Sequence, residues 1–264
     1  MASHYQFHEI PRSRIATFDV LATGKMKHHM AALLEFDVTQ SRMKMRQAKR
    51  SGSRISFTAW LLGVIARAVT LHPEAAGFLV SKRKLITFHD INISLLVEKT
   101  VNRKKVPLPL LIEKVNRKSP EEVTLEIEKA LNAVMTDKDI VLHKRSTRYE
   151  NLYYSLPGFL RRMVWRIMLR NPRFAYSKMG NVSVTSPGMM GKVNGWFIHT
   201  SVHPLSFGVG SVIRKPLAVN NEVRIREVLN MTILLDHDVI DGAPMLRFIN
   251  DLTKMLEGGE GIQA

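Results

Sequence analysis

The stretch Thr232–Leu252, TILLDHDVIDGAPMLRFINDL, joins an apolar run to a segment with helical periodicity. The run before Asp236 is typical of a strand, and apolar residues recur at helical spacing after Asp241. His237 therefore falls where a strand ends and a helix begins, so we expect its side chain to project from a rigid edge of the fold. A neutral imidazole in such a place can take a proton from a thiol or hydroxyl and return it later.

The residues of this stretch leave a second interpretation open. Aspartates favour turns and helix N-termini because their carboxylates accept hydrogen bonds from nearby backbone N–H groups. Asp236, Asp238 and Asp241 are then turn and cap residues, and His237 between them has no chemical role.

Composition predicts one globular domain that covers residues 1–264. The chain is 45% hydrophobic, and neither a repeat nor a linker-like segment divides it. It contains no cysteine, which excludes disulfides, thiolate nucleophiles and thiolate metal sites. The N-terminal residues lack the apolar core of a signal peptide, and no apolar run approaches the ~18 residues of a membrane span. We therefore expect a soluble cytoplasmic protein.

The charge of the chain indicates anionic partners. The formal net charge is +16 and the isoelectric point is near 10.2. A phosphate-bearing small molecule or an anionic lipid suits this charge, and so does a surface that only confers solubility. No nucleic-acid recognition motif accompanies the charge, so we do not expect nucleic acid as a partner.

The periodicity predicts an α/β fold with helices packed on a largely antiparallel or mixed sheet. Ser56–Leu71 has the spacing of a buried helix, and Lys84–Glu98 is typical of two strands or one long bent strand. Ser119, Pro120 and Glu122 predict a helix that begins with a capping box. Apolar residues also suggest one face for this helix and for the last helix; these are Leu125, Ile127, Leu131, Val134 and Met135 in the first, and Leu246, Ile249, Leu252 and Leu256 in the second.

Asparagine-containing pairs predict two hairpin turns in the C-terminal half. Asn194-Gly195 is the stronger turn signal and Asn220-Asn221 the weaker. Strand-like segments flank both pairs, so we expect each pair to connect two strands.

One basic segment, about residues 139–178, fits this plan less easily. Its helical part, Phe159–Arg170, places apolar residues on one stripe and arginines opposite to them. The apolar residues are Phe159, Leu160, Met163, Val164, Ile167 and Met168, and the arginines are Arg161, Arg162, Arg166 and Arg170. The pattern favours a helix that covers a core with its charged face in solvent, and it also suits contact with an anionic membrane or a partner.

The stretch Leu235–Ala243, LDHDVIDGA, closely resembles the H-x-x-x-D-G signature of the acyltransferase catalytic domain of 2-oxoacid dehydrogenase complexes. That domain is related to chloramphenicol acetyltransferase. Further segments resemble the same domain in the same order, over nearly the whole chain. They are IPRSRIATFDVLATGKMKHHMAALLEFDVTQ, SFTAWLLGVIARAVTLHPEAAGFL, FHDINISLLVEK, NRKSPEEVTLEIEKA, GNVSVTSPG and HPLSFGVGSVIRKPLAV.

This resemblance implies a chloramphenicol acetyltransferase-like two-layer α/β sandwich that forms homotrimers, with the active site between subunits. Assembly into a larger core stays open. His237 takes the role of the general base that deprotonates a thiol of coenzyme A or dihydrolipoamide. Asp241 is implied to support the local structure, through an arginine for which Arg12 and Arg14 are candidates.

The resemblance also implies a hydroxyl that stabilises the tetrahedral oxyanion. Alignment places Thr185 at this position, in the strand-like segment VSVT. One oxyanion donor is typically worth about 3 kcal/mol in the transition state. Ser186 is the weaker candidate because neighbouring side chains of a strand point to opposite faces. Thr185 is also compatible with a purely structural role as a β-forming residue.

Two features depart from the family pattern. Asp238 stands where the family usually has arginine, and an anion beside the base would stabilise the imidazolium and weaken the base at neutral pH. The chain also begins almost at the catalytic domain, whereas dehydrogenase acyltransferases normally carry lipoyl and subunit-binding domains before it. We therefore expect it to use free acyl-CoA, or a lipoyl group carried on another chain.

The sequence predicts an acyl-CoA-dependent acyltransferase without a metal. Coenzyme A or acyl-CoA would serve as a substrate, and the acyl acceptor would be a thiol or another nucleophile. The alternative is a non-catalytic trimeric assembly or binding protein that keeps the acyltransferase fold, for which Asp238 and the apparent absence of a lipoyl domain argue.

Overall fold

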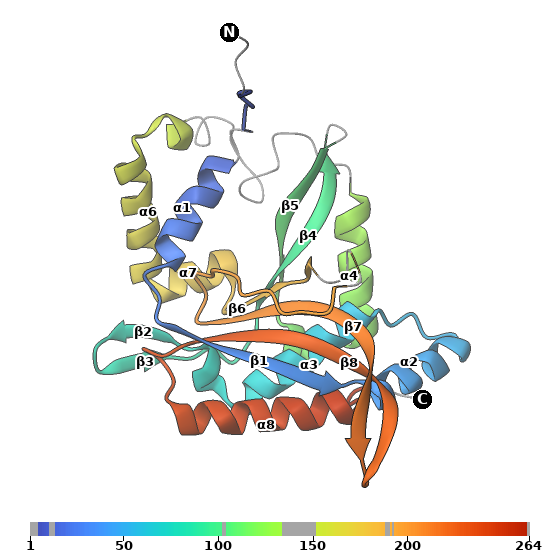
Figure 1. Ribbon diagram of the computed structural model, residues 1–264. Coiled ribbons are helices and arrows are strands. Elements are labelled where there is room, and N and C mark those ends of the chain that lie inside the picture. Colours follow the sequence, from blue (N-terminus) through green and yellow to red (C-terminus); the bar gives the residue numbers. More distant parts are fainter. Residues whose placement is uncertain are drawn as a thin grey trace.

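A six-stranded mixed sheet runs through the protein in the order β1-β8-β7-β6-β4-β5 (Figure 1). The structure, a computed structural model, describes residues 5–10, 14–101, 104–133, 152–187, 191 and 193–262. The strands of this sheet are β1 (His29–Asp37), β4 (Ile93–Val101), β5 (Lys104–Ile112), β6 (Val182–Thr185), β7 (Leu205–Val219) and β8 (Glu222–Asp236). Strand β6 is parallel to both neighbours and the other pairs are antiparallel, which confirms the mixed sheet predicted from the sequence.

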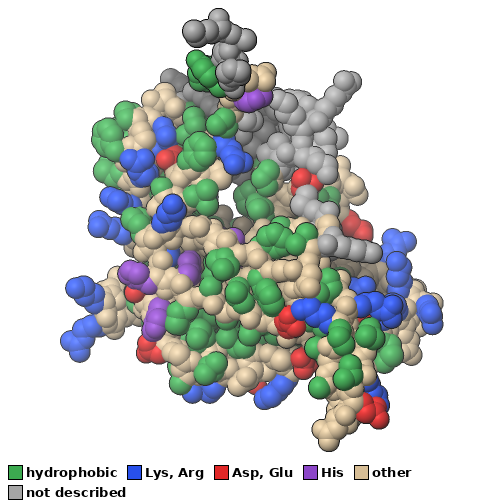
Figure 2. Space-filling model, viewed as in Figure 1, with side chains coloured by type: hydrophobic (Ala, Val, Ile, Leu, Met, Phe, Trp, Pro, Cys, Tyr) green, Lys and Arg blue, Asp and Glu red, His purple; other side chains and the backbone are tan. Residues whose placement is uncertain are grey.

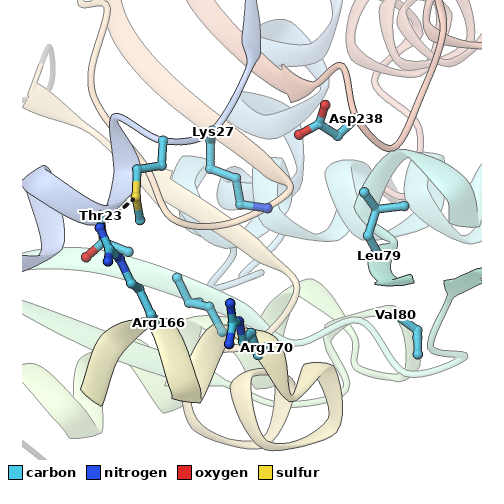
Figure 3. Close-up of a pocket in the computed structure, with 9 residues that line it drawn as sticks. Thr23, Lys27, Leu79, Val80, Arg166, Arg170 and Asp238 are labelled. Atoms are coloured by element: carbon cyan, nitrogen blue, oxygen red, sulfur yellow. Dashed lines mark hydrogen bonds between the residues drawn. The ribbon is translucent and has the colours of Figure 1, made fainter. Parts of the chain in front are cut away.

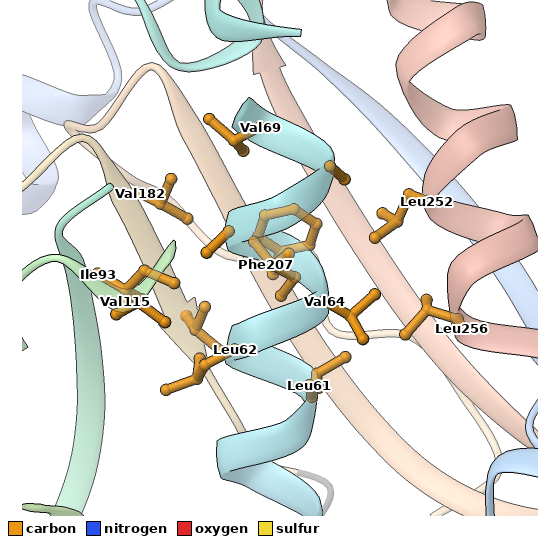
Figure 4. Packing of buried hydrophobic residues seen from close by; sticks show 14 of the residues in the cluster. Leu61, Leu62, Val64, Val69, Ile93, Val115, Val182, Phe207, Leu252 and Leu256 are labelled. Atoms are coloured by element: carbon orange, nitrogen blue, oxygen red, sulfur yellow. The ribbon is translucent and has the colours of Figure 1, made fainter. Parts of the chain in front are cut away.

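Two long helices, α3 (Phe57–Leu71) and α8 (Gly242–Gly258), cover one face of the sheet (Figure 1). Helix α3 begins where the Ser56 side chain accepts a hydrogen bond from the N–H of Ala59. Between helices and sheet lies one hydrophobic core, in which Phe207 of β7 packs among side chains of both helices (Figure 4). These two layers confirm the predicted sandwich.

The remaining helices surround the sheet. They are α1 (Arg14–Gly24), α2 (Thr39–Arg50), α4 (Pro120–Asn132), α6 (Gly158–Arg170) and α7 (Pro172–Met179). Helix α4 begins with the predicted capping box, formed by Ser119 and Glu122. Its expected apolar face was partly wrong, because Leu125 and Leu131 are exposed and Val123 is buried with Ile127. Val134 and Met135 lie outside the described residues.

The region predicted as two strands or one long bent strand, Lys84–Glu98, forms two strands that belong to different sheets. Strand β3 (Lys84–Ile86) pairs with β2 (Phe78–Ser81) in a small hairpin, and β4 belongs to the main sheet.

At the N-terminal end of α8, Leu246 is exposed although the helical spacing placed it on the apolar face, whereas Ile249, Leu252 and Leu256 are buried as predicted.

Of the two predicted hairpin turns, only the weaker signal is correct. Asn220 and Asn221 join β7 to β8 and both have positive φ, 51° and 63°. Asn194 instead lies in an irregular segment, residues 193–204, and its side-chain oxygen accepts a hydrogen bond from Asn230 of β8. Gly208 of β7 leaves room for this segment, since a Cβ there would lie 2.7 Å from the Phe197 carbonyl oxygen. Contact with the sheet has therefore overridden the local turn preference.

The orientation favoured for the basic helix was wrong. None of the residues of α6 is buried, and its apolar residues Phe159, Met163 and Ile167 are exposed. Arg161, expected on the solvated face, points inward and donates a hydrogen bond to the buried Asp19 of α1 at 2.7 Å. A buried carboxylate requires a cationic partner, so the ion pair between Asp19 and Arg161 sets the orientation of α6. Residues 139–151 of the basic segment lie outside the described residues.

Candidate active site

The turn between β8 and α8 presents His237 at the edge of the sheet. The backbone N–H of His237 donates to the carbonyl of His28 at 2.9 Å, so the turn is tied to the residue that precedes β1. The His237 side chain is half exposed, at 50%. Figure 2 shows histidine side chains gathered near this end of the sheet. The imidazole is therefore accessible and carried by a hydrogen-bonded backbone.

A buried ion pair holds the base of this turn. Asp236 is 1% exposed, and its Oδ2 atom accepts a hydrogen bond from Nζ of Lys27 at 2.6 Å. Its Oδ1 atom accepts from the N–H of Asp238 at 3.3 Å. Sequence reasoning missed Lys27 because 209 residues separate it from Asp236, and no local pattern connects them.

Asp238 is directed toward His28. Both of its carboxylate oxygens lie 3.0 Å from Nδ1 of His28, and both side chains are largely exposed. Within the described part of the chain, Asp238 has no ion pair with His237. The anion that the sequence places next to the candidate base thus has a different partner.

Asp241 occupies the N-cap position of α8 but makes no side-chain capping bond. It is 88% exposed, and its Oδ1 atom lies 3.9 Å from Nδ1 of His237, too far for a hydrogen bond. Among the residues that the structure describes, Asp241 has no arginine partner; Arg14 makes no ion pair with it, and Arg12 lies outside them. The implied support through an arginine stays a prediction.

Thr185 ends β6 in the middle of the sheet and is only half-buried. It pairs with Gly208 of β7, which in turn pairs with Thr232 of β8. With ~3.3 Å per strand residue and ~4.8 Å between strands, the backbone of Thr185 lies roughly 19 Å from that of His237. One chain therefore does not bring the two candidate catalytic side chains together.

Ser186 and the partly buried His199 lie near Thr185. The Ser186 hydroxyl is buried and has no hydrogen-bond partner among the described residues. His199 Nε2 lies 2.5 Å from the Ser206 hydroxyl, and a Cβ on Gly208 would lie 2.9 Å from its Nδ1 atom. Burial lowers the pKa of His199. Strand periodicity could not indicate this histidine, because it belongs to the irregular segment that crosses the sheet.

His203 is fully buried behind the turn. Its Nε2 atom lies 2.9 Å from the carbonyl of Met179, and its own carbonyl oxygen lies 2.9 Å from Nε2 of His29. Burial lowers the pKa of His203 to about 4, so the ring is neutral at pH 7. His203 therefore has a structural role, and neither of its ring nitrogens is exposed for catalysis.

A pocket of about 630 Å³ adjoins the turn (Figure 3). Lys27, Arg166 and Arg170 supply cations to its lining, and Asp238 supplies an acid. The rest of the lining is Thr23, Met26, Leu79, Val80 and Leu169. Cations beside apolar walls suit a ligand that is anionic at one part and apolar at another. Over the described ranges, no three acidic or histidine side chains are placed to hold a metal ion.

Residues 173–263 match the family model of the 2-oxoacid dehydrogenases acyltransferase catalytic domain. A relative from Mycoplasma capricolum, the dihydrolipoyllysine-residue acetyltransferase component of a pyruvate dehydrogenase complex, is 23% identical over 254 residues. That alignment covers 91% of this chain and 48% of the relative. The chain is thus similar to this acyltransferase domain over residues 173–263. It spans about half the length of the curated relatives that match most of it.

Solved structures have the same fold as this chain. The cubic core of a pyruvate dehydrogenase multienzyme complex has a TM-score of 0.70 at 18% identity, covering 99% of this chain and 96% of that one. Chloramphenicol acetyltransferase has a TM-score of 0.52 at 11% identity, covering 97% and 100%. The predicted chloramphenicol acetyltransferase-like fold is therefore confirmed.

The residues that match the family model include the candidate catalytic residues but not Lys27 or helix α6. Thr185, His237 and Asp241 all lie within residues 173–263. Lys27, which holds the turn, and helix α6 lie outside this range. The matched range thus comprises β6, β7, β8 and the turn that carries His237, whereas α6 lies before it.

Proposed function

We propose that the protein transfers an acyl group between coenzyme A and a thiol or another nucleophilic acceptor, with His237 as the general base. The observation that carries the proposal is the position of His237: a half-exposed imidazole on the turn that carries the H-x-x-x-D-G residues. An exposed imidazole on a backbone held by hydrogen bonds can meet a substrate thiol with little reorganisation.

In the proposed reaction, His237 takes the proton of the acceptor thiol. The thiolate attacks the thioester carbonyl, and a tetrahedral intermediate forms with its charge on oxygen. The hydroxyl of Thr185 donates a hydrogen bond to this oxyanion. The intermediate collapses, the carbon–sulfur bond to the donor breaks, and His237 returns its proton to the leaving thiolate. Because the Nδ1 atom of His237 faces Asp241, we assign the proton transfer to Nε2.

We propose that each site combines His237 of one copy with Thr185 of another, in a homotrimer. The separation of these residues within one chain and the exposure of His237 support this arrangement. A complementation experiment tests it. The variants His237→Ala and Thr185→Ala, each expected to be strongly impaired alone, are co-expressed and purified as mixed oligomers. Recovered acyl transfer supports the shared site, and its absence in verified mixed oligomers contradicts it.

The acyl carrier in this proposal is coenzyme A, with a lipoyl group on another chain as the second candidate carrier. The charged and apolar lining of the pocket beside the turn is suited to such substrates. Coenzyme A carries phosphates, which Lys27, Arg166 and Arg170 can attract, and an apolar part, which Leu79 and Leu169 can contact.

Acyl transfer is measured directly as thiol release from a panel of acyl-CoAs, with dihydrolipoamide as the first acceptor. Turnover by the wild type supports the proposal, and absence of turnover with every donor and acceptor pair counts against it. The alternative of a non-catalytic assembly protein rests in part on Asp238. The contact of Asp238 with His28 weakens this support, because the carboxylate is engaged away from His237.

A further inference from the structure

Helix α6 displays an apolar row to solvent. Phe159, Met163 and Ile167 follow one another at four-residue spacing and are 65%, 49% and 59% exposed. We name these three residues the α6 ridge. Side chains of this kind usually face a core, and here they remain outside although α6 is packed on α1.

Cations border the α6 ridge. Arg162, Arg166 and Arg170 are exposed on the same helix, and none of them has a carboxylate partner among the described residues. Residues 158–179, which include α6 and α7, contain six lysines and arginines and no aspartate or glutamate. This surface therefore carries positive charge that the described residues do not neutralise.

Neighbouring helices extend the same surface. Phe18 and Met26, in α1 and just after it, are 50% and 48% exposed, and Phe174 of α7 is 47% exposed. Figure 2 shows apolar and basic side chains intermingled over α1 and α6. The acid of α1, Asp19, is buried against Arg161 and adds no negative charge to the surface.

Buried polar contacts fix the orientation of α6. The Asp19 carboxylate accepts hydrogen bonds from Arg161 at 2.7 Å and from the hydroxyl of Tyr153 at 2.9 Å. Trp165 donates to the same Tyr153 hydroxyl at 3.1 Å. These contacts occupy the inner side of α6, so the α6 ridge is held outward before any partner binds.

We propose that the α6 ridge docks the protein on an anionic phospholipid bilayer. A helix with exposed apolar residues, bordering arginines and no acid has the character of helices that lie in the membrane interface. The charge complementarity selects a bilayer with anionic headgroups, whose phosphates the arginines contact. No described helix is long and apolar enough to cross a membrane, so the contact is peripheral. Arg166 and Arg170 also line the pocket, and docking therefore brings the candidate active site to the bilayer surface.

Binding to vesicles tests this proposal. The full chain is sedimented with vesicles that contain phosphatidylglycerol and, separately, with pure phosphatidylcholine vesicles. We expect binding to the anionic vesicles only. Replacing Arg162, Arg166 and Arg170 together by Gln should weaken binding about a hundredfold, since each basic residue near an anionic surface contributes roughly a fivefold factor. Replacing the α6 ridge by Ser should also abolish sedimentation while the charge is unchanged.

Matched controls separate this effect from net charge and from misfolding. Lys49, Arg50 and Arg54 are exposed in and after α2, which lies on the opposite side of the molecule from α6 (Figure 1). Their joint replacement by Gln removes the same charge and should leave vesicle binding within threefold of the wild type. Equal loss in both charge variants would overturn the proposal, because binding would then follow net charge alone.

The oligomeric state separates a bilayer from a second copy of the chain as the occupant of the ridge. If the α6 ridge variant no longer forms the oligomer, and the wild type does not bind anionic vesicles, the ridge is a subunit contact and the proposal fails. If the variant keeps the oligomeric state and the unfolding transition of the wild type but loses vesicle binding, the proposal is supported. Neither readout depends on acyl transfer.

Discussion

The two carboxylate oxygens of Asp238 both lie 3.0 Å from Nδ1 of His28. This contact bears on the main departure of the chain from the pattern of the family that it resembles, because the sequence places an acid directly after the candidate base. In the structure, the acid joins the turn to the residue before β1, while the imidazole of His237 faces Asp241. Asp238 is therefore a partner of His28 and not of the candidate catalytic group.

The first prediction concerns Asp238. Replacing it by Asn should keep acyl transfer within about threefold of the wild type. The free energy of unfolding should change by less than about 1 kcal/mol, because exposed ion pairs contribute little. Steady-state kinetics and urea unfolding measure the two effects. A hundredfold change in kcat would show that Asp238 acts on the chemistry itself.

The second prediction concerns the buried pair below the turn. Lys27→Met should lower the free energy of unfolding by about 3 kcal/mol, because the buried Asp236 carboxylate loses its partner. Lys118→Met is the matched control. Lys118 is similarly exposed, at 28% against 26%, but its partner Glu126 is 36% exposed, so we expect a loss below about 1 kcal/mol. Equal losses in urea unfolding would contradict the structural role of Lys27.

The third prediction concerns the oxyanion donor. Thr185→Ala should reduce kcat about 10²- to 10³-fold, as the loss of one oxyanion hydrogen bond does in other enzymes. Thr185→Ser keeps the hydroxyl and should retain most of the activity. Ser186→Ala tests the weaker candidate and should change kcat by less than threefold. If the Ser186 variant lost activity and the Thr185→Ala variant did not, the assignment would be reversed.

The fourth prediction concerns stability in acid. Burial lowers the pKa of His203 to about 4, from 6.5 for an ordinary histidine. The unfolded chain therefore binds more protons than the folded chain between these values, and stability falls as the pH drops. The contribution of His203 is fully present above pH 6.5, and about 2 kcal/mol of it is lost between pH 7.5 and 5.

Urea unfolding at these two pH values checks this contribution. His203→Gln should lose about 2 kcal/mol less than the wild type over the same interval. His199, whose pKa is also lowered by burial, adds a loss of the same sign in both proteins. The exposed His89 is the control position, and His89→Gln should decline as the wild type does. An unchanged decline in His203→Gln would show that other groups carry the acid sensitivity.

The sequence correctly predicted features that depend on contacts between residues close together in the chain. The capping box of Ser119 and Glu122 uses atoms within three residues of each other, so a short window of sequence contains the whole cause. The position of His237 at a strand end followed from the change of periodicity around it. The general-base role proposed for it rests on the family resemblance and could not be derived from the turn alone.

Contacts between distant segments decided what the sequence could not predict. Helical spacing identified the apolar stripe of α6, but the buried Asp19 of α1, 142 residues from Arg161, determines which side faces inward. Asn194-Gly195 has the local preference of a hairpin, but it lies in an irregular segment where Asn194 accepts a hydrogen bond from Asn230 of β8. The distance between Thr185 and His237 likewise depends on strand order, which periodicity does not reveal.

The most direct test of the account is acyl transfer by His237→Ala, measured beside the wild type with the same acyl-CoA and acceptor. His28→Ala serves as the control, because it removes a neighbouring imidazole that contacts Asp238 of the turn. We predict that kcat falls at least about 10²-fold in His237→Ala, as expected for loss of a general base, and stays within threefold of the wild type in His28→Ala. Wild-type turnover by His237→Ala would contradict the proposed mechanism.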